Sequence, residues 1–160
     1  GRWDEAEACF CEAERMQAER QPDYPLLYSL QGFRYGDLLL VAAERAAWRT
    51  VLPSPSGRGV GGEGLAEACR AVSRRTAQTL KWVKAQNWLL DIAIDHLTLG
   101  RAALYEAILT AADVRRSQSD IERAVAGLCR AGDVEFVARA LLTCAWLRHL
   151  LGARSGSDSA

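Results

Sequence analysis

Three residues within one short stretch have side chains that could do acid–base or metal chemistry: Asp91, Asp95 and His96. The two aspartates are four residues apart, so on a helix they share a face, and with a third ligand they could hold a metal ion. His96 follows Asp95 directly and therefore points about 100° away from it on a helix. We therefore expect a groove-facing acidic pair or a packed histidine here, and no metal or catalytic site.

The other reactive side chains do not form a recognisable nucleophile system either. His149 lies among leucines near the end of a predicted helix, where a positive charge is electrostatically favourable. No Ser-His-Asp or Cys-His combination is apparent, so we predict no enzyme activity. The five cysteines form no even framework, and we expect them to be packing thiols in a reducing cytoplasm: Cys9, Cys11, Cys69, Cys129 and Cys144.

The charge balance argues against two classes of partner. Twenty Lys and Arg residues balance twenty Asp and Glu residues, which gives a formal net charge of zero over the 160 residues. Nucleic-acid and membrane-surface binding both use a basic excess, so neither partner is expected. No apolar run reaches the roughly 18 residues of a membrane span, and no glycine-rich phosphate loop or other cofactor motif is present.

Residues 88–110 are the stretch that the remaining elements must be arranged around. Their side chains are apolar over nearly the whole of a helical wheel. The polar residues fall on one narrow stripe: Asp91, Asp95, Thr98 and Glu106. A helix with so little polar surface must be covered on at least two sides, so we predict an inner helix with neighbours before and after it.

The rest of the chain alternates between narrow and wide apolar faces. The periodicity predicts helices over residues 2–19, 24–47, 65–86, 88–110, a fifth from Ser119 to the residue before Gly132, and 133–151. The first, third and fifth carry one apolar stripe, whereas the others are apolar almost all round. Helix pairs of this kind stack on one another, so the sequence predicts an all-α fold, an α-solenoid of about three antiparallel helix pairs.

Two segments do not fit a helical pattern. Residues 52–64 contain two prolines and five glycines and predict an irregular insert, either a mobile binding loop or a tolerated surface insertion. Residues 153–160 are small and polar and predict a disordered tail, which leaves 1–152 as a single repeat domain. The chain opens at Gly1 without a methionine, and we expect it to be a piece of a larger protein.

Several spacings match the pattern of one repeat family. The matching residues are Gly1-x4-Ala6-x3-Phe10-x2-Ala13, Ala124-x3-Leu128-x2-Ala131, Tyr28-x3-Gly32-x2-Tyr35 and Leu99-Gly100. Taken in order, they resemble the alternating second and first helices of tetratricopeptide repeats, over most of the chain except residues 52–64. The array is similar to those at the C-terminal end of large bacterial signalling ATPases and transcription regulators.

This resemblance implies a protein- or peptide-binding scaffold with a concave groove lined by the first helices of the pairs. The positions that it places in the groove are Ser29, Phe33, Asp37, Arg101 and Tyr105. Arg and Tyr suit peptide capture, since Arg binds carboxylates and Tyr offers contact area at low entropic cost. Two alternatives remain: a structural spacer that self-associates through the exposed ends of the solenoid, and an enzyme with a site at Asp91, Asp95 and His96.

Overall fold

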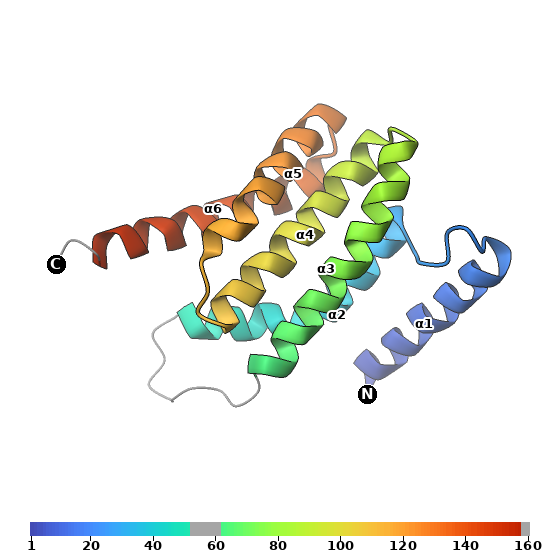
Figure 1. The fold of residues 1–160 in the computed structure, drawn as a ribbon, viewed down its shortest axis with the longest axis horizontal. Helices are drawn as coiled ribbons and strands as arrows, with labels where there is room; N and C mark the ends of the chain where they lie inside the picture. Colours follow the sequence, from blue (N-terminus) through green and yellow to red (C-terminus); the bar gives the residue numbers. More distant parts are fainter. Residues whose placement is uncertain (52–61, 158–160) are drawn as a thin grey trace.

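The computed structural model describes residues 1–51 and 62–157, with side chains described up to residue 152, and confirms the all-α class. The described residues form six α-helices and one short 3₁₀-helix (Figure 1): α1 (Arg2–Arg20), α2 (Ser29–Val51), α3 (Gly62–Ala85), α4 (Leu89–Leu109), η1 (Val114–Ser117), α5 (Gln118–Ala131) and α6 (Val134–Ser157).

Helix α4 is the centre of the molecule, as its broadly apolar wheel predicts. It packs against α2, α3, α5, η1 and α6. Its polar residues are not a solvent-facing stripe, however, because neighbouring helices cover Asp95 and Thr98 completely. Each of these side chains is satisfied by a hydrogen bond, so burial does not leave an unpaired polar group: Thr79 Oγ1 donates to Asp95, and Thr98 donates to the Ile94 carbonyl.

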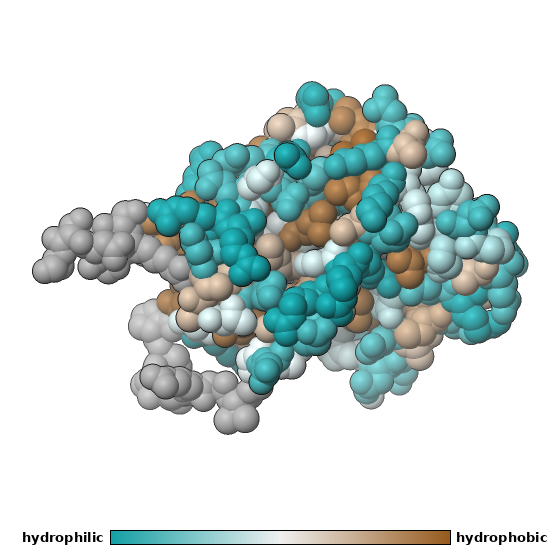
Figure 2. Space-filling model, in the orientation of Figure 1, coloured by the Kyte–Doolittle hydropathy of each residue, from teal (hydrophilic) through white to brown (hydrophobic). Residues whose placement is uncertain are grey.

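Helices α3, α4 and α5 lie side by side and alternate in direction, and α2 and α6 cross behind them (Figure 1). Figure 2 shows hydrophobic side chains in a strip where α4 is seen between α3 and α5, flanked by hydrophilic side chains of those two helices. This distribution follows from the sequence, since α3 and α5 each carry one apolar stripe and α4 carries apolar residues nearly all round.

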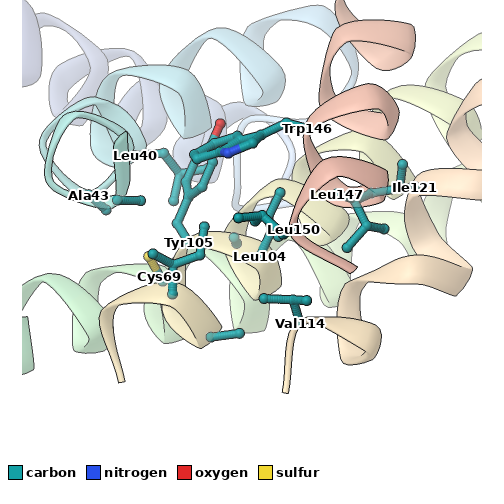
Figure 3. Packing of buried hydrophobic residues seen from close by; sticks show 14 of the residues in the cluster. Leu40, Ala43, Cys69, Leu104, Tyr105, Val114, Ile121, Trp146, Leu147 and Leu150 are labelled. Carbon is teal, nitrogen blue, oxygen red and sulfur yellow. The ribbon is translucent and has the colours of Figure 1, made fainter. Parts of the chain in front are cut away.

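The main core lies where α2, α4 and α6 meet. Figure 3 shows Tyr105 of α4 reaching toward the indole ring of Trp146 on α6, and their ring centroids are 5.7 Å apart. Trp48 of α2 stacks on the other side of that indole at 3.9 Å. Leu40 and Leu104 fill the space beneath these rings and are fully buried. The aromatic contacts therefore join three helices that are distant in sequence.

Two glycines let α5 approach α4 closely. A Cβ atom at Gly100 would lie 2.6 Å from Ile121 Cγ1 and 3.1 Å from the Ile121 backbone nitrogen. A Cβ atom at Gly127 would lie 2.7 Å from the Cβ of Ala93. Both distances are shorter than van der Waals contact, so these two positions fix the separation of the two helices.

Helix α1 has the predicted bounds but not the predicted buried face. None of its residues is buried, and Trp3 is more than half exposed. It is held by a few specific contacts: Phe10 stacks on Tyr35 at 4.9 Å, and Glu14 accepts hydrogen bonds from Arg75 and from the backbone N–H of Leu27. The helix therefore lies on α2 and α3 without contributing to the core.

Two predicted helix starts are wrong, and in both cases a local backbone feature explains the difference. The second helix begins at Ser29 and not at residue 24, because Ser29 has φ +56°, which a continuous helix does not allow. The fifth helix begins at Gln118 and not at Ser119. Asp113 accepts a hydrogen bond from the backbone N–H of Arg115 at 3.0 Å and begins η1, which runs directly into α5.

Both segments predicted to be irregular contain residues that the structure shows to be helical. Residues 62–64 of the predicted insert are the first turn of α3, and residues 52–61 lie outside the described residues. Gly152 does not end the last helix, since α6 continues to Ser157, and the predicted domain boundary at 152 therefore falls inside a helix. A glycine near a helix end is a favourable stop only where the chain turns, and here it does not turn.

Candidate functional site

The predicted groove residues do not line an open groove. Phe33 is 1% exposed, Tyr105 2% and Arg101 5%. Helix α6 covers this surface: Phe136 meets Phe33 edge-on at 4.9 Å, and the guanidinium of Arg139 lies over the Phe33 ring at 5.4 Å. The prediction that these three side chains face a ligand is therefore wrong, because a later helix of the same chain occupies the face.

The buried Arg101 lies at the centre of a charged network whose other charged members are partly exposed. Its guanidinium forms an ion pair with Asp37 and a 3.1 Å ion pair with Glu44, both on α2. Its Nε donates to the Tyr105 hydroxyl at 3.0 Å. Asp37 also pairs with Arg139 of α6. These bonds join α2, α4 and α6, so the network has a structural role.

The acid–histidine group diverges as its spacing predicts. Asp95 faces α3, where Thr79 Oγ1 donates to it at 2.9 Å, whereas His96 faces α5 and its Nδ1 lies 2.8 Å from Asp120. Burial, with a smaller contribution from the charge of Asp91, raises the pKa of Asp95 to about 7, although the Thr79 hydrogen bond opposes the shift. Among the described residues, no group of three His, Cys, Asp or Glu side chains could hold a metal ion.

The structure also contains a hollow that the sequence pattern did not predict. It is a cleft of about 490 Å³ where the α1–α2 connection meets the end of α3 and the start of α4. Four aromatic and four polar side chains line it together with Pro22 and Val83, and we call it the aromatic cleft: Arg20, Gln21, Asp23, Tyr24, Tyr28, Trp82, Gln86 and Trp88.

The four rings of the aromatic cleft contact one another and form walls at different angles. Trp82 is nearly perpendicular to both tyrosines, with centroid distances of 5.3 Å to Tyr24 and 6.3 Å to Tyr28. Trp88 lies nearly parallel to Tyr28 at 6.2 Å. Three separate chain segments supply these rings, so the tertiary fold and not one helix creates the surface.

Unusual backbone conformations hold two of these rings in place. Ser29 and Asn87 both have φ +56°, and they directly follow Tyr28 and directly precede Trp88. A non-glycine residue with positive φ is uncommon, and for Ser29 it costs on the order of 1–3 kcal/mol. Ser29 Oγ donates to Asp91 Oδ1 at 2.5 Å, which ties the start of α2 to the first turn of α4. Ser29 and Asp91, two residues that the sequence singled out, thus hold together the helix starts that carry Tyr28 and Trp88.

A second, smaller hollow of about 310 Å³ lies between α1 and α2. Its wall is mostly aliphatic, with Glu7 and Arg45 at its edge, and Arg45 lies over the Trp3 ring at 5.4 Å. It has neither convergent polar groups nor a strained backbone, so it offers less specificity than the aromatic cleft.

The cysteines are also arranged differently from the prediction. Cys69 and Cys144 are buried packing residues, but Cys9, Cys11 and Cys129 are exposed. Burial raises the pKa of the Cys69 thiol to about 12, so this side chain is an inert apolar group at neutral pH. Cys11 lies 3.3 Å from the Tyr35 hydroxyl and helps to attach α1 to α2.

One signal in the sequence could have pointed to the aromatic cleft. Trp82 falls outside the apolar stripe of its own helix, and Tyr24 precedes the start of α2. Large aromatic residues off the periodic stripe and next to helix ends have no core to fill, which is typical of binding surfaces.

Comparison of the chain with protein-family models, with curated proteins and with solved structures finds no match. In the part of the chain that the structure describes, no helix combines the length and the apolar character needed to cross a bilayer.

Proposed function

We propose that this chain is a non-catalytic scaffold module that binds a protein or peptide, and that the aromatic cleft is its binding site. The observation that carries the proposal is the convergence of Tyr24, Tyr28, Trp82 and Trp88 in a cleft of about 490 Å³. Clefts of this size, lined by aromatic rings with a few polar groups, are the usual form of ligand sites. Tyr and Trp are also the residues most enriched at binding hot spots.

The backbone at the two sides of the cleft supports the same conclusion. The positive φ angle of Ser29 has an energetic cost and places Tyr28 on the cleft wall, whereas Asn87 ends α3 in a left-handed turn, closed by a 3.2 Å hydrogen bond from the Trp88 N–H to the Val83 carbonyl, that sets the direction of Trp88. Strain of this kind is concentrated at binding and active sites, where it fixes a surface before the ligand arrives.

We further propose a tetratricopeptide-like solenoid as the architecture that presents this cleft. The alternating directions of α3, α4 and α5, and the burial of α4 between its neighbours, support it (Figure 1). The proposed binding face is not the one that the family resemblance implies, because α6 covers Phe33, Arg101 and Tyr105. The reduced thiols suit a cytoplasmic protein, and the balanced charge suits a protein partner better than a nucleic acid.

Selection of peptides from a displayed random library on the full chain tests this proposal. We expect selected peptides to lose about 30-fold in affinity on Trp88→Ala, which removes an exposed ring of the cleft. Trp3→Ala is the matched control, because Trp3 is 53% exposed but lies outside the cleft. Selected peptides that bind both variants equally, or a library that yields no binder, would contradict the proposal.

A second candidate function, self-association, is favoured by the outer face of α6. Val134, Ala138, Leu141 and Ala145 are exposed at spacings of four, three and four, and Leu142 beside them is 73% exposed. This is the spacing of a coiled-coil seam. In an antiparallel pair centred on Leu141, Glu135 of one copy would approach Arg148 of the other, because the two residues lie at nearly equal distances on either side of it.

Sedimentation of the full chain over a range of concentrations tests the second candidate. We expect a dimer that Leu142→Glu dissociates, since the substitution places a charge on the apolar seam. Glu122→Gln, on the exposed side of α5, is a control that should leave the dimer intact. A monomer at every concentration would exclude a dimer through this face.

A further inference from the structure

We infer that the aromatic cleft takes proline-rich peptide in the polyproline II conformation. The inference deepens the proposed function and rests on it, because it names the class of peptide that the same cleft would bind. Three features of the cleft carry it: the arrangement of ring faces, the surplus of hydrogen-bond donors and the cancellation of charge.

The ring faces offer successive flat apolar surfaces at different angles. Trp82 stands at 86° to Tyr24 and at 82° to Tyr28, and Trp88 continues the wall nearly parallel to Tyr28 at 21°. A polyproline II helix has three residues per turn and presents its rigid rings in several directions around its axis. Such a helix docks into grooves walled by aromatic rings, where prolyl rings pack on the aromatic faces.

Each of the four aromatic residues of the cleft carries a polar group that can donate a hydrogen bond, whereas the side-chain amides of Gln21 and Gln86 both donate and accept and the Asp23 carboxylate accepts. The structure records no hydrogen bond to the indole Nε1 of Trp82 or Trp88, or to the hydroxyl of Tyr24 or Tyr28, among the described residues. The indole N–H groups can only donate, and the guanidinium of Arg20 adds further donors.

These hydrogen-bond donors suit a proline-rich peptide better than a peptide bound as an extended strand. A polyproline II peptide makes no internal hydrogen bonds and its prolines have no N–H group, so its carbonyl oxygens need donors and it offers few in return. An extended strand would require acceptors as well as donors along the wall. Asp23 supplies the one carboxylate among the lining residues.

The charge of the cleft does not favour a cation. Aromatic walls also bind ammonium groups such as methylated lysine, and that binding is strengthened by a surplus of negative charge. Here the positive charge of Arg20 offsets the negative charge of Asp23 at the same opening. An uncharged proline segment enters such a site without the loss of hydration that a charged side chain suffers.

Preorganisation on both sides reduces the entropic cost of binding. The positive φ angles of Ser29 and Asn87, with the 2.5 Å hydrogen bond from Ser29 to Asp91, fix the segments that carry Tyr28 and Trp88. A proline-rich peptide is already close to its bound conformation before it binds. Binding therefore restricts few additional torsions, which raises affinity for a given contact area.

The test is a titration of the full, isotope-labelled chain with three synthetic peptides of equal length, followed by NMR at the indole N–H resonances. The first is an uninterrupted proline run, the second replaces its prolines with glycine, and the third carries trimethyl-lysine in a glycine-rich background. We expect the proline peptide alone to shift the resonances of Trp82 and Trp88 in a saturable way, and to leave the resonance of Trp3 unchanged.

Tyr28→Phe distinguishes the contribution of the hydroxyl hydrogen bond to affinity from that of ring packing, because it keeps the aromatic face and removes the hydroxyl. We expect it to weaken binding of the proline peptide about fivefold, whereas Trp88→Ala weakens it more. Tyr24→Phe tests the hydroxyl of the second tyrosine in the same way, by the change in affinity for the proline peptide. Both phenylalanine variants retain the packing of the rings, and an unchanged indole spectrum without peptide confirms that the cleft is intact.

The outcomes separate this inference from the proposed function. Stronger binding of the trimethyl-lysine peptide, or proline-independent binding at Trp82 and Trp88, would overturn the inference and leave the cleft a peptide site. Binders from the random library that use the cleft but contain no proline would do the same. If neither the three peptides nor any library binder perturbs the cleft, both the inference and the proposed function fail.

Discussion

We expect this protein to lose stability between mildly acidic and mildly basic pH, and we expect the replacement of Asp95 with asparagine to remove most of that loss. Asp95 is 4% exposed, and burial between α3 and α4 raises its pKa from 3.8 to about 7. In the unfolded chain the carboxyl returns to its ordinary value. Between these two pKa values, the folded state holds a proton that the unfolded state has lost.

The sign of the effect follows from that difference in proton binding. Because the folded state binds more protons across this window, the free energy of unfolding falls as pH rises from about 4 to about 7 and is constant above it. Each pH unit inside the window contributes about 1.4 kcal/mol, so between about pH 5 and about pH 8 the loss is about 2–3 kcal/mol. Asparagine cannot ionise, and its side-chain oxygen still accepts the hydrogen bond from Thr79.

Urea unfolding followed by circular dichroism at the two pH values measures this contribution. The difference in unfolding free energy between them should be smaller in Asp95→Asn than in the parent by about 2–3 kcal/mol. Glu122→Gln, a change of one exposed carboxylate on α5, should keep the parental difference. If Asp95→Asn shows the same pH dependence as the parent, Asp95 does not carry a raised pKa and the reasoning is refuted.

Three further predictions follow from the packing. Gly100→Ala should lower the free energy of unfolding, measured with urea, by about 1–3 kcal/mol, because the added Cβ would meet Ile121. Gly64→Ala is the control: a Cβ there has no atom within 4 Å, and alanine is a better helix former than glycine, so the free energy of unfolding should stay the same or rise. Arg101→Ala should lower the free energy of unfolding by about 1–3 kcal/mol, because it removes a buried side chain and its hydrogen bonds to Asp37, Glu44 and Tyr105, while the two carboxylates are partly exposed and Asp37 keeps Arg139 as a partner; an unchanged free energy of unfolding would show that the network does not stabilise the fold. In a native thiol titration the buried Cys69 should react only when the protein unfolds, and rapid modification of Cys69 would mean that the core around it opens.

Periodicity predicted the helices well because it reports burial within one element. The six helical segments and the central place of α4 follow from the width of each apolar face, a local property of the sequence. The divergence of Asp95 and His96 was also predictable, since their relative directions are fixed by helix geometry alone.

The groove and the cleft required information that periodicity does not contain. The apolar wheel of α6 predicts that it is covered, but it does not say that it lies over Phe33 and Tyr105. The family resemblance placed Arg101 in an open groove, whereas Asp37, 64 residues away in sequence, pairs with it inside the fold. The aromatic cleft depends on the positive φ of Ser29, which no pattern of residue types predicts for a serine.

The shallow attachment of α1 has a consequence for how binding could be detected. A helix without a buried residue opens at low free energy, so its amide hydrogens should exchange with solvent faster than those of α4. Arg20 ends this helix, and the segment that follows it forms one wall of the aromatic cleft. A ligand that contacts both this segment and Trp82 binds only when α1 is in place, so by mass action it lowers the population of molecules in which α1 is detached. Slower amide exchange along the whole of α1 would then report occupancy of a site that touches only its last residue.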